Sequence, residues 1–576
     1  MTRFLLFAAV YLVTFNVYGQ QQPDFRPPMD IPLVLSGNFG ELRSNHFHSG
    51  IDFKTQGVTG HKIFAIGSGY VSRIKVQTGG YGKALYIAHP GGYTSVYGHL
   101  EDYNGTIGNY VRDIQYQRQS HGFDLYLQPS EIEVSKGDVI AYSGNTGSSS
   151  GPHLHFEIRR TSDQHPLNGL FFNFPIEDDL PPRIVKAAIY PLDGSSHVDN
   201  ASEPLYLFTR ESGNVTRLAG DNPIRVHGQI GFGVEVYDYL NGASNRCGVF
   251  SLDLEIDGKQ VFYSEMNEFS FAESRFINAH IDYALKHERN RNVQRLFKLP
   301  YNELSIYKFT DNDGAVLITD TLVHDVRITA TDSYGNSSSL AFQVKGNGAP
   351  AGNNAITPGD PGLSSDGYVL PYNEESVYAD QNIELRFPAY CFYENIAFKF
   401  DRFDGPEALY SDIYQVHDQT VPVHRAFEIS LIPDRLPVRN PEKLCLVTSE
   451  EDGSYEFAGG DFTDGKVTGQ LRSFGKYAIG IDTIPPEITP LDLFAGKDIT
   501  EQPGIRFRIL DDLSGIDSYN GYINGQWVLF EYDPKNNLLF HEFDDRVPFS
   551  EKINELEIEL KDAKGNTTNY HTTFLR

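Results

Sequence analysis

Polar and apolar residues alternate in the stretch Gly151-Pro152-His153-Leu154-His155-Phe156-Glu157-Ile158-Arg159. Side chains two positions apart share one face of a β-strand, so the alternation predicts a half-buried strand. Its polar face carries His153, His155 and Glu157, and the apolar residues between them point into a core. Two imidazoles side by side on one rigid surface supply part of a metal site. The remaining ligands must come from elsewhere in the chain.

The chain is long and rich in residues that favour β-structure. It has 576 residues, 40% of them hydrophobic, which at roughly 150 residues per domain is enough for about three or four separate cores. Tyr and Phe occur in short runs such as Val234–Tyr237, and 53 glycines and 31 prolines supply frequent turns. This pattern is typical of strands rather than helical bundles. We therefore predict an all-β protein, with an antiparallel-sheet domain followed by about three β-sandwich domains of Ig-like type.

Charge and cysteine content restrict the possible partners and covalent links. The net charge of −28 argues against a nucleic-acid partner, because phosphate binding depends on clusters of Lys and Arg. The chain has three cysteines, Cys247, Cys391 and Cys445, and none lies in a metal-type C-x-x-C motif. Cys391 and Cys445 could pair in an oxidising compartment, which would leave Cys247 unpaired.

Residues 1–19 have the pattern of a secretory signal peptide. Arg3 precedes an apolar run from Phe4 to Val13, and the small residue Gly19 marks a cleavage site. The run is shorter than the roughly 20 residues that span a bilayer, although a short buried element or a membrane anchor is an alternative. We expect the mature chain to begin near Gln20, to have no membrane span, and to be secreted to the periplasm or cell envelope.

The residues with catalytic chemistry concentrate in a predicted N-terminal domain, residues 20–178. Lys83–His89 and Tyr93–Leu100 flank a Gly-rich turn and predict a β-hairpin, with His99 near the end of its second strand. Residues 105–135 are polar and poorly periodic, which predicts a long loop. Loops of this length inside a compact domain tend to be functional. The insertion at 106–134 is therefore either a lid or a solvated surface excursion.

An internal repeat follows the N-terminal domain. Asp178–Ile184 resembles Asp482–Ile488, since both segments contain Asp followed by a Pro-Pro pair. The closing strands of both copies end in Asp and a Gly-Asn turn, which suits a sandwich of roughly 100 residues. We predict Ig-like β-sandwiches at 179–346 and 482–576. Residues 347–367 form a Gly/Pro/Asn linker, and 368–481 form another β-sandwich without a catalytic constellation.

Partners for the paired histidines lie upstream, at His48 and Asp52. They are an even number of residues apart, so in an extended segment both face the same side as Gly50, which leaves space for an ion. Zinc accepts His and carboxylate ligands, and a catalytic zinc keeps one position for water. His48, Asp52 and one of the paired histidines make three ligands, and the other histidine is free to act as a base. Each motif alone is common by chance, but their occurrence in one domain favours a catalytic metal site.

Seven segments carry a more specific signal: Phe39-Gly40-Glu41-Leu42-Arg43, His48-Ser49-Gly50-Ile51-Asp52, Gly79-Gly80-Tyr81-Gly82, Tyr97-Gly98-His99-Leu100, Lys136-Gly137-Asp138-Val139-Ile140, Ser143-Gly144-Asn145-Thr146-Gly147 and Gly151-Pro152-His153-Leu154-His155-Phe156-Glu157. In order and spacing, they resemble the zinc endopeptidases of the lysostaphin and LytM type, peptidase family M23. The resemblance covers about residues 32–165.

This resemblance implies specific roles. The family's zinc ligands correspond to His48, Asp52 and His155, and its catalytic histidines correspond to His153 and His99. None of the five is substituted, whereas some relatives that have lost ligands serve only as activators of other wall enzymes. The insertion at 106–134 departs from the family pattern and could narrow or block the site.

We therefore expect a secreted zinc metalloendopeptidase that hydrolyses peptide cross-links of peptidoglycan, with D-alanyl bonds favoured over polyglycine bridges. Zn²⁺ is the only cofactor expected; His153 takes the proton of the attacking water, and His99 helps the zinc to stabilise the oxyanion. The β-sandwiches either bind an envelope protein partner or act as spacers. The alternative is a non-enzymatic envelope scaffold, or an activator of other wall hydrolases, with an occluded metal site.

Overall fold

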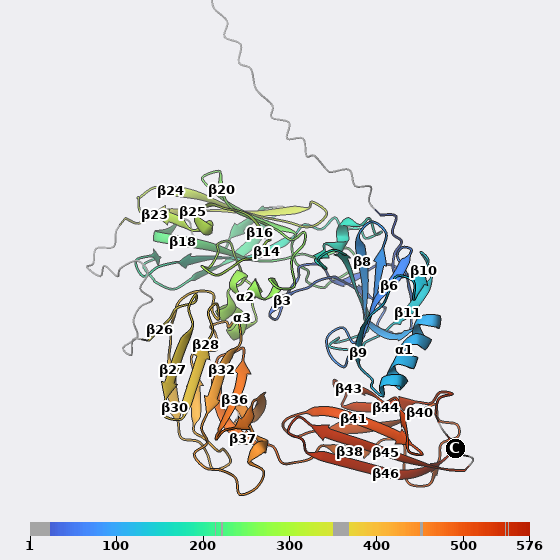
Figure 1. Ribbon diagram of the computed structural model, residues 1–576. Coiled ribbons are helices and arrows are strands. Elements are labelled where there is room, and N and C mark those ends of the chain that lie inside the picture. Colours follow the sequence, from blue (N-terminus) through green and yellow to red (C-terminus); the bar gives the residue numbers. More distant parts are fainter. Residues whose placement is uncertain are drawn as a thin grey trace, which may run out of the picture.

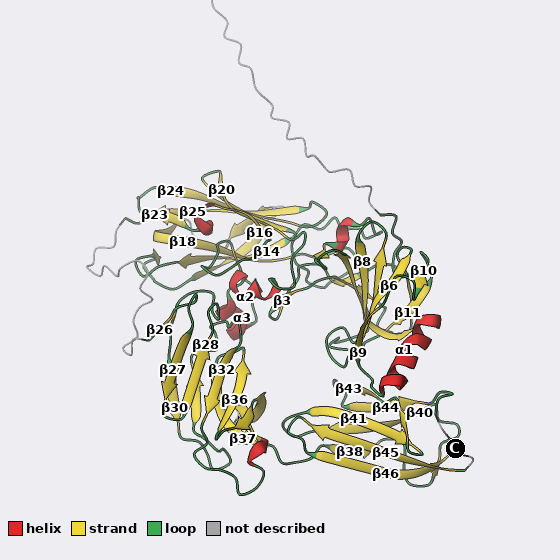
Figure 2. Cartoon of the chain, in the orientation of Figure 1, coloured by secondary structure: helices red, strands yellow, loops and turns green. Residues whose placement is uncertain are grey.

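The structure, a computed structural model, describes residues 23–212, 215–220, 223–348, 368–449, 453–547, 549–550 and 552–576. Strands make up 47% of the chain and helices 7%, which confirms the predicted all-β class (Figure 2). The β-rich domains follow one another around a ring, so that the last lies beside the first (Figure 1). The predicted signal peptide and nearly all of the predicted linker 347–367 lie outside the described residues.

None of the described helices is both long enough and apolar enough to cross a membrane.

One 11-stranded sheet forms the N-terminal domain, and β12 lies at its centre between β4 and β8. The strands on the main path of the sheet, in their spatial order, are β1 (Leu35–Gly37), β4 (Ile51–Lys54), β12 (His153–Arg160), β8 (Tyr93–Tyr103), β7 (Lys83–His89), β6 (Gly69–Val76) and β10 (Glu133–Val134). Strands β5 (Lys62–Phe64), β9 (Phe123–Tyr126), β11 (Val139–Ser143) and β13 (Pro166–Leu167) pair beside this path. The predicted hairpin is confirmed, because β7 and β8 pair in antiparallel fashion.

Strand β12 has the predicted alternation but is covered on both faces. Leu154, Phe156 and Ile158 are fully buried in the core, as expected. On the other face, His155 is 3% exposed and Glu157 1% exposed, so the prediction of a half-buried strand is wrong. Neighbouring residues of the same domain cover this face; the ring of Tyr81, for example, stacks on His155. The polar face of β12 is therefore an internal network.

The predicted long loop at 105–135 is also wrong, because this segment forms helix α1 (Gly105–Arg118) followed by β9 and β10. Ile107, Val111 and Gln115 recur every four residues and form the buried face of α1, as a 3.6-residue period requires. Ile107 and Val111 join the core of the N-terminal domain. The many polar residues of this segment occupy the rest of the helix surface, so the helical period of the buried residues was not evident from the sequence.

The first sandwich is one hydrogen-bonded sheet that folds back on itself, because β18 pairs with β14 and also, in parallel, with β25. Its strands are β14 (Arg183–Pro191), β15 (His197–Val198), β16 (Leu205–Ser212), β17 (Val215–Leu218), β18 (Ile224–Tyr237), β19 (Ser251–Ile256), β20 (Lys259–Glu265), β21 (Gln294–Arg295), β22 (Tyr307–Thr310), β23 (Val316–Ile318), β24 (Val323–Thr331) and β25 (Ser337–Gly346). Two short helices, α2 (Ile277–His280) and α3 (Tyr283–Arg289), lie between β20 and β21.

The second sandwich has two five-stranded sheets around one core and a small additional pair of strands. Its strands are β26 (Val369–Leu370), β27 (Ser376–Asp380), β28 (Ile383–Phe387), β29 (Ile396–Ala397), β30 (Phe400–Phe403), β31 (Ile413–Val416), β32 (Phe427–Leu431), β33 (Leu444–Ser449), β34 (Tyr455–Gly459), β35 (Asp461–Thr463), β36 (Lys466–Leu471) and β37 (Gly475–Ile481). Cys391 and Cys445 are buried here as free thiols, as Cys247 is elsewhere, so the possible disulfide is not formed.

The third sandwich packs a four-stranded sheet against a five-stranded one. Its strands are β38 (Glu487–Pro490), β39 (Lys497–Asp498), β40 (Gly504–Leu510), β41 (Ile516–Ile523), β42 (Gln526–Val528), β43 (Glu531–Asp533), β44 (Leu538–Glu542), β45 (Ile553–Asp562) and β46 (Thr567–Leu575).

The first sandwich is joined to the N-terminal domain by an apolar contact beside His48. A hairpin of β2 (Leu42–Arg43) and β3 (His46–Phe47) extends from the N-terminal domain. Phe47 is fully buried, and its ring lies 5.6 Å from that of Phe269 in the first sandwich. The two domains therefore share a core next to the predicted ligand.

The third sandwich returns to the N-terminal domain and closes the ring on α1 (Figure 1). The ring of Trp527 lies edge-on to Tyr116 of α1 at 5.4 Å. Lys83 of β7 forms an ion pair with the half-buried Glu531 at 2.9 Å. Lys535 donates a hydrogen bond to Ser149 O at 3.1 Å, within the loop that precedes β12. The insertion is thus a docking surface for the end of the chain.

Candidate metal centre and catalytic groove

Three buried side chains, those of His48, Asp52 and His155, converge beside strand β12. His48 Nε2 lies 3.0 Å from Asp52 Oδ1 and 3.1 Å from His155 Nδ1. His155 Nδ1 lies 2.9 Å from the same oxygen of Asp52. Sheet register accounts for one of these approaches, because His155 on β12 is the direct partner of Asp52 on β4. The structure therefore brings together the three residues predicted as metal ligands.

His48 is oriented by a residue that the first sandwich holds in place. Its Nδ1–H donates to Asn38 O at 2.7 Å, which leaves Nε2 for the centre. The Asn38 side chain donates to Gly248 O at 2.7 Å and accepts from Gly248 N at 2.8 Å. Gly248 belongs to the loop between β18 and β19 of the first sandwich. This paired contact links that domain to the predicted ligand.

His155 is oriented by a fully buried carboxylate, Glu157. His155 Nε2–H donates to Glu157 Oε1 at 2.8 Å, which leaves Nδ1 for the centre. Ser49 and Tyr81 donate to the same oxygen, and Arg159 Nε donates to Oε2 at 2.5 Å. Burial alone would raise the pKa of Glu157, but Arg159 and His155 lower it. Glu157 is therefore ionised and fixes the tautomer of His155, as outer partners of metal-bound histidines do.

Asp52 keeps one oxygen for the centre and gives the other to Arg43. Arg43 Nη2 donates to Asp52 Oδ2 at 2.5 Å, whereas Oδ1 faces the histidines. Burial would raise the pKa of Asp52, but the charge of His48 and the close approach of the His153 and His155 rings hold it well below its usual range. Burial likewise acts to lower the pKa of His155, yet Asp52 and Glu157 raise it to about 9. At neutral pH, His155 therefore carries a second proton, on Nδ1. A metal ion must displace this proton, so the affinity for a metal falls as pH decreases.

Two further histidines face the same centre, and one loop orients both. His153 Nδ1–H donates to Gly151 O at 2.8 Å, and His99 Nδ1–H donates to Thr146 O at 2.8 Å. Each ring therefore presents Nε2 as a lone pair. Their ring centroids are 4.7 Å apart. Burial and the neighbouring histidines lower the pKa of His99 to about 3, so this ring is neutral.

The backbone of β8 is distorted at His99. Its φ is +58°, a left-handed value that is uncommon for a residue other than glycine. The pairing of β8 with β7 shifts register across Gly98 and His99, as at a β-bulge, and its pairing with β11 shifts register two residues further on. Bulges redirect side chains and are frequent beside active sites. The irregularity therefore places His99 against His153, which strict strand alternation would not do.

A groove of about 570 Å³ opens beside this centre. His153 and His99 line it, and its other lining residues are Ser36, Arg43, Asp52, Lys54, Gln56, Gly57, Ser148, Ser149, Ser150, Gly151, Pro152 and Asn245. Asn245 comes from the first sandwich, on the loop that also holds Asn38. None of the described residues between 106 and 134 lines the groove. In this structure, the insertion does not cover the site.

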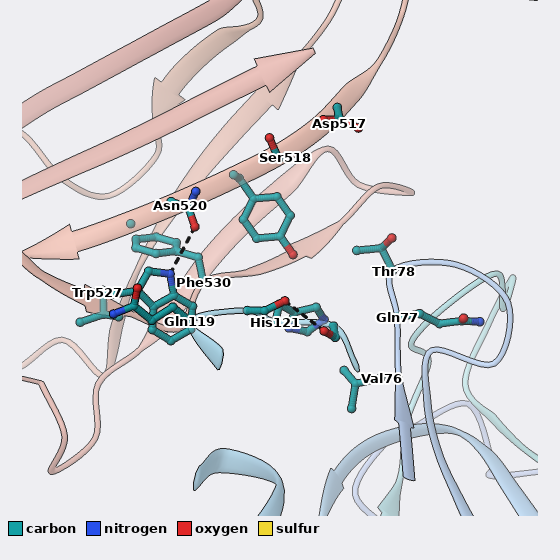
Figure 3. Close-up of a pocket in the computed structure, with 15 residues that line it drawn as sticks. Val76, Gln77, Thr78, Gln119, His121, Asp517, Ser518, Asn520, Trp527 and Phe530 are labelled. Atoms are coloured by element: carbon teal, nitrogen blue, oxygen red, sulfur yellow. Dashed lines mark hydrogen bonds between the residues drawn. The ribbon is translucent and has the colours of Figure 1, made fainter. Parts of the chain in front are cut away.

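A second cavity, of about 480 Å³, lies between the N-terminal domain and the third sandwich (Figure 3). Gln119 and His121 face it from the segment after α1, and Asn520 and Trp527 face it from the third sandwich. It contains none of the five predicted site residues. It is therefore a gap at the docking surface, separate from the catalytic groove.

All five residues predicted from the sequence lie together, but one explanation changes. A Cβ at Gly50 would lie 2.4 Å from Phe156 O and 2.8 Å from Glu157 Cγ. Gly50 thus permits close packing against β12 rather than leaving space for an ion.

Sequence reasoning missed the supporting roles of Asn38, Arg43 and Glu157. Arg43 and Glu157 stood within recognised segments, whereas nothing in the sequence indicated the contact between Asn38 and Gly248.

The donor set fits zinc. Two imidazole nitrogens and one carboxylate oxygen converge within 4.8 Å of one another, and the other polar atom of each side chain already has a partner. Tetrahedral zinc with ligands at about 2.0–2.2 Å requires neighbouring donors about 3.3–3.6 Å apart. The observed separations of 2.9–3.1 Å need only a small expansion. Three protein ligands leave the open position that a catalytic zinc keeps.

Comparison with known proteins agrees with this geometry. Residues 46–116 and 121–168 match peptidase family M23, and residues 367–482 match the Zu5-like domain. The chain therefore contains an M23-type peptidase domain followed by β-sandwich domains. The match to the M23 family covers the strand β12 and all five predicted site residues.

Curated relatives resemble part of the chain. The chain is 31% identical over 165 residues to the DD-carboxypeptidase/endopeptidase Mpg of Neisseria meningitidis, with 27% of this chain and 30% of that protein covered. It is 27% identical over 164 residues to the peptidoglycan DD-endopeptidase ShyA of Vibrio cholerae, with 27% and 31% covered. The chain thus spans about a third of the length of these relatives.

Among solved structures, the catalytic domain of lysostaphin from Staphylococcus simulans matches with a TM-score of 0.18 and 24% identity. The match covers 24% of this chain and 91% of that one.

Replacing Asn38 with alanine is expected to weaken zinc binding about 10-fold, the lower end of the scale on which outer partners of metal-bound histidines act. Alanine keeps the backbone oxygen that accepts from His48 and removes only the side-chain contacts to Gly248 that hold it in place. Competition with a chromophoric zinc chelator measures the affinity. Asn168→Ala is the matched control, because Asn168 is also buried and donates to Met266 O of the first sandwich at 3.2 Å. An equal loss in both variants would assign the effect to the domain interface as a whole.

Proposed function

We propose that the protein is a zinc metalloendopeptidase that hydrolyses peptide cross-links of peptidoglycan outside the cytoplasm. The observation that carries this proposal is the convergence of His48, Asp52 and His155 beside two further histidines, His153 and His99, at the wall of an open groove. The similarity of this domain to Mpg and ShyA supports peptidoglycan as the substrate class. The N-terminal signal pattern supports secretion, to a periplasm or cell envelope.

The side chains divide the work of hydrolysis. His48, Asp52 and His155 would hold the zinc, which when bound supplies Lewis-acid activation of water and of the substrate carbonyl. His153 Nε2 carries a lone pair and lies 3.5 Å from Asp52 Oδ1, so it is placed to accept the proton of the attacking water. Gly151 O holds its Nδ1–H and fixes this tautomer.

For His99 we propose a role other than the oxyanion donor expected from the sequence. Donation from Nε2 requires a second proton, because Nδ1–H is already bound to Thr146 O. A pKa of about 3 opposes that protonation. We propose instead that His99 is a second acceptor, which holds the attacking water or a substrate N–H beside His153.

The groove suits a peptide with small side chains. Gly57, Gly151 and the serines at 148–150 line it, so a substrate backbone can approach closely. Lys54, the register partner of His153, adds a positive charge near the centre. Peptidoglycan stem peptides carry carboxylates and D-alanyl residues, which fit this combination. We therefore propose D-alanyl bonds as the target.

A non-enzymatic envelope scaffold is the second candidate. The three sandwiches and the closed ring favour a binding role in addition to any chemistry, and the Zu5-like match names no activity. The accessible groove and the complete set of five site residues favour the enzyme.

Incubation of the purified protein with peptidoglycan sacculi tests the proposal. We expect release of muropeptides that a chelator stops and added zinc restores, and mass analysis of the products identifies the bond. A matched incubation with the Asp52→Ala variant controls for contaminating hydrolases. No chelator-sensitive release, together with no metal in elemental analysis, would favour the scaffold.

A further inference from the structure

Three carboxylates meet at the junction between the N-terminal domain and the first sandwich. Asp178 lies in the linker before β14, Asp238 directly follows β18, and Asp332 directly follows β24. Each offers an oxygen, and these atoms lie within 4.8 Å of one another. None of the three belongs to the proposed catalytic centre.

The cluster contains buried carboxylate oxygens that accept no hydrogen bond. Asp238 is 3% exposed, and its Oδ1 has no partner. Asp178 Oδ2 is also buried without a partner. A buried charge without compensation is strongly unfavourable in a folded protein. These oxygens point to a ligand that supplies positive charge.

The three carboxylates repel one another, and burial together with this repulsion raises the pKa values of two of them. Burial, followed by the charges of Asp178 and Asp332, raises the pKa of Asp238 to about 8. Burial and Asp332 also raise the pKa of Asp178, to about 6. Only one backbone N–H, that of Tyr239, acts in the opposite direction on Asp238. A bound cation would remove this repulsion.

The surrounding backbone holds the carboxylates in position. Asp332 accepts from Tyr334 N at 2.8 Å and from Asn336 N at 2.9 Å. The Asn336 side chain donates to Asp178 O at 3.2 Å, which ties the linker to the closing turn. The cluster is therefore fixed before any ligand arrives, which lowers the entropy lost on binding.

The third sandwich repeats this layout with different charge compensation. Asn566 donates to Asp482 O at 3.2 Å, as Asn336 does to Asp178. In the third sandwich, however, Asp482 Oδ2 accepts a hydrogen bond from Ser514 N at 3.1 Å, and the Lys443 ammonium donates to Asn566 Oδ1. The first cluster has neither of these contacts among the described residues, so it is the stronger candidate.

We propose that Asp178, Asp238 and Asp332 form a Ca²⁺ site that locks the first sandwich to the N-terminal domain. All donors are oxygens, and Ca²⁺ takes six to eight oxygen ligands in flexible geometry at about 2.3–2.6 Å. The set lacks the nitrogen and sulfur donors that zinc prefers. Backbone carbonyls and water complete the coordination.

The location gives the site a consequence for the catalytic centre. Asp238 begins the loop that contains Gly248, and Gly248 holds Asn38 against His48. Asn245 of the same loop lines the catalytic groove. Ca²⁺ at Asp238 therefore fixes one end of the segment that supports a zinc ligand. The proposal itself concerns binding and does not depend on peptidase activity.

Calorimetric titration of the zinc-loaded full chain with Ca²⁺, paired with thermal unfolding, tests the site. We expect Ca²⁺ to bind and to raise the Tm. In the Asp238→Asn variant, the number of Ca²⁺ ions bound per chain falls by one, or the affinity falls at least tenfold, and the rise in Tm shrinks. Asp253→Asn is the matched control, because Asp253 is a half-buried carboxylate of the same sandwich outside the cluster.

Asp178→Asn, in the segment before β14, is a second variant for the case in which Asp238→Asn does not fold. No Ca²⁺ binding by the wild-type chain would overturn the proposal. Unchanged stoichiometry and affinity in a folded cluster variant would also overturn it, as would an equal loss in Asp253→Asn. Mg²⁺ in place of Ca²⁺ is expected to give a smaller shift, because Mg²⁺ demands near-ideal octahedral geometry.

Discussion

Replacing His153 with alanine is expected to reduce turnover of peptidoglycan about 10²- to 10⁴-fold, the usual contribution of a general base, while zinc stays bound. His153 is the most exposed of the five site residues described here, with 16% of its side chain accessible. Its removal leaves the three converging donors in place. Steady-state hydrolysis and metal content by elemental analysis are measured on the same sample.

The matched variant is Asp52→Ala, which is expected to lose both turnover and zinc. Asp52 Oδ1 lies 2.9 Å from His155 Nδ1 and 3.0 Å from His48 Nε2, the two nitrogens that face the centre. The two variants thus separate proton transfer from metal retention. Equal loss of zinc in His153→Ala and Asp52→Ala would overturn this division of roles.

Replacing Glu157 with alanine is expected to destabilise the N-terminal domain by about 3–5 kcal/mol, because Arg159 would remain as a buried charge without its partner. Zinc affinity should fall about 10- to 100-fold in addition, because His155 loses the acceptor that sets its tautomer. Hydrogen exchange of peptides that cover β12 measures the local stability. Chelator competition measures the affinity.

Glu235→Ala is the matched control for this variant. Glu235 is also fully buried and pairs with an arginine, Arg291, at 2.8 Å, but it lies in the first sandwich. It should destabilise its own domain and leave exchange in β12 and zinc affinity unchanged. A similar fall in zinc affinity in both variants would contradict a specific role for Glu157.

Local patterns in the sequence predicted the centre of the N-terminal domain well. The alternation around His153 placed β12 correctly, and the Gly-rich turn after His89 placed the hairpin of β7 and β8. The even spacing of His48 and Asp52 brought both to one side, although His48 lies outside a strand. The first two features follow from strand geometry over a few residues, which the local sequence pattern determines directly.

Features that depend on distant packing could not be predicted in the same way. The bulge at His99 arises where β8 pairs with two strands of different register. The burial of Glu157 depends on side chains contributed from several strands. The contact between Asn38 and Gly248 spans 210 residues of sequence. In α1, polar residues such as Arg112 and Asp113, which pair with charged residues of the third sandwich, masked a helical period of only three buried positions.

The closed ring gives the protein an intrinsic optical probe. Trp527 is the single tryptophan of the chain, and it contacts Tyr116 of α1 at the point where the third sandwich meets the N-terminal domain. Its indole N–H donates to Asn520 within its own sandwich at 3.3 Å, so the residue stays with that domain if the contact opens. The emission of the unlabelled protein therefore reports separation of the two ends of the chain, and it does so without contribution from any other indole.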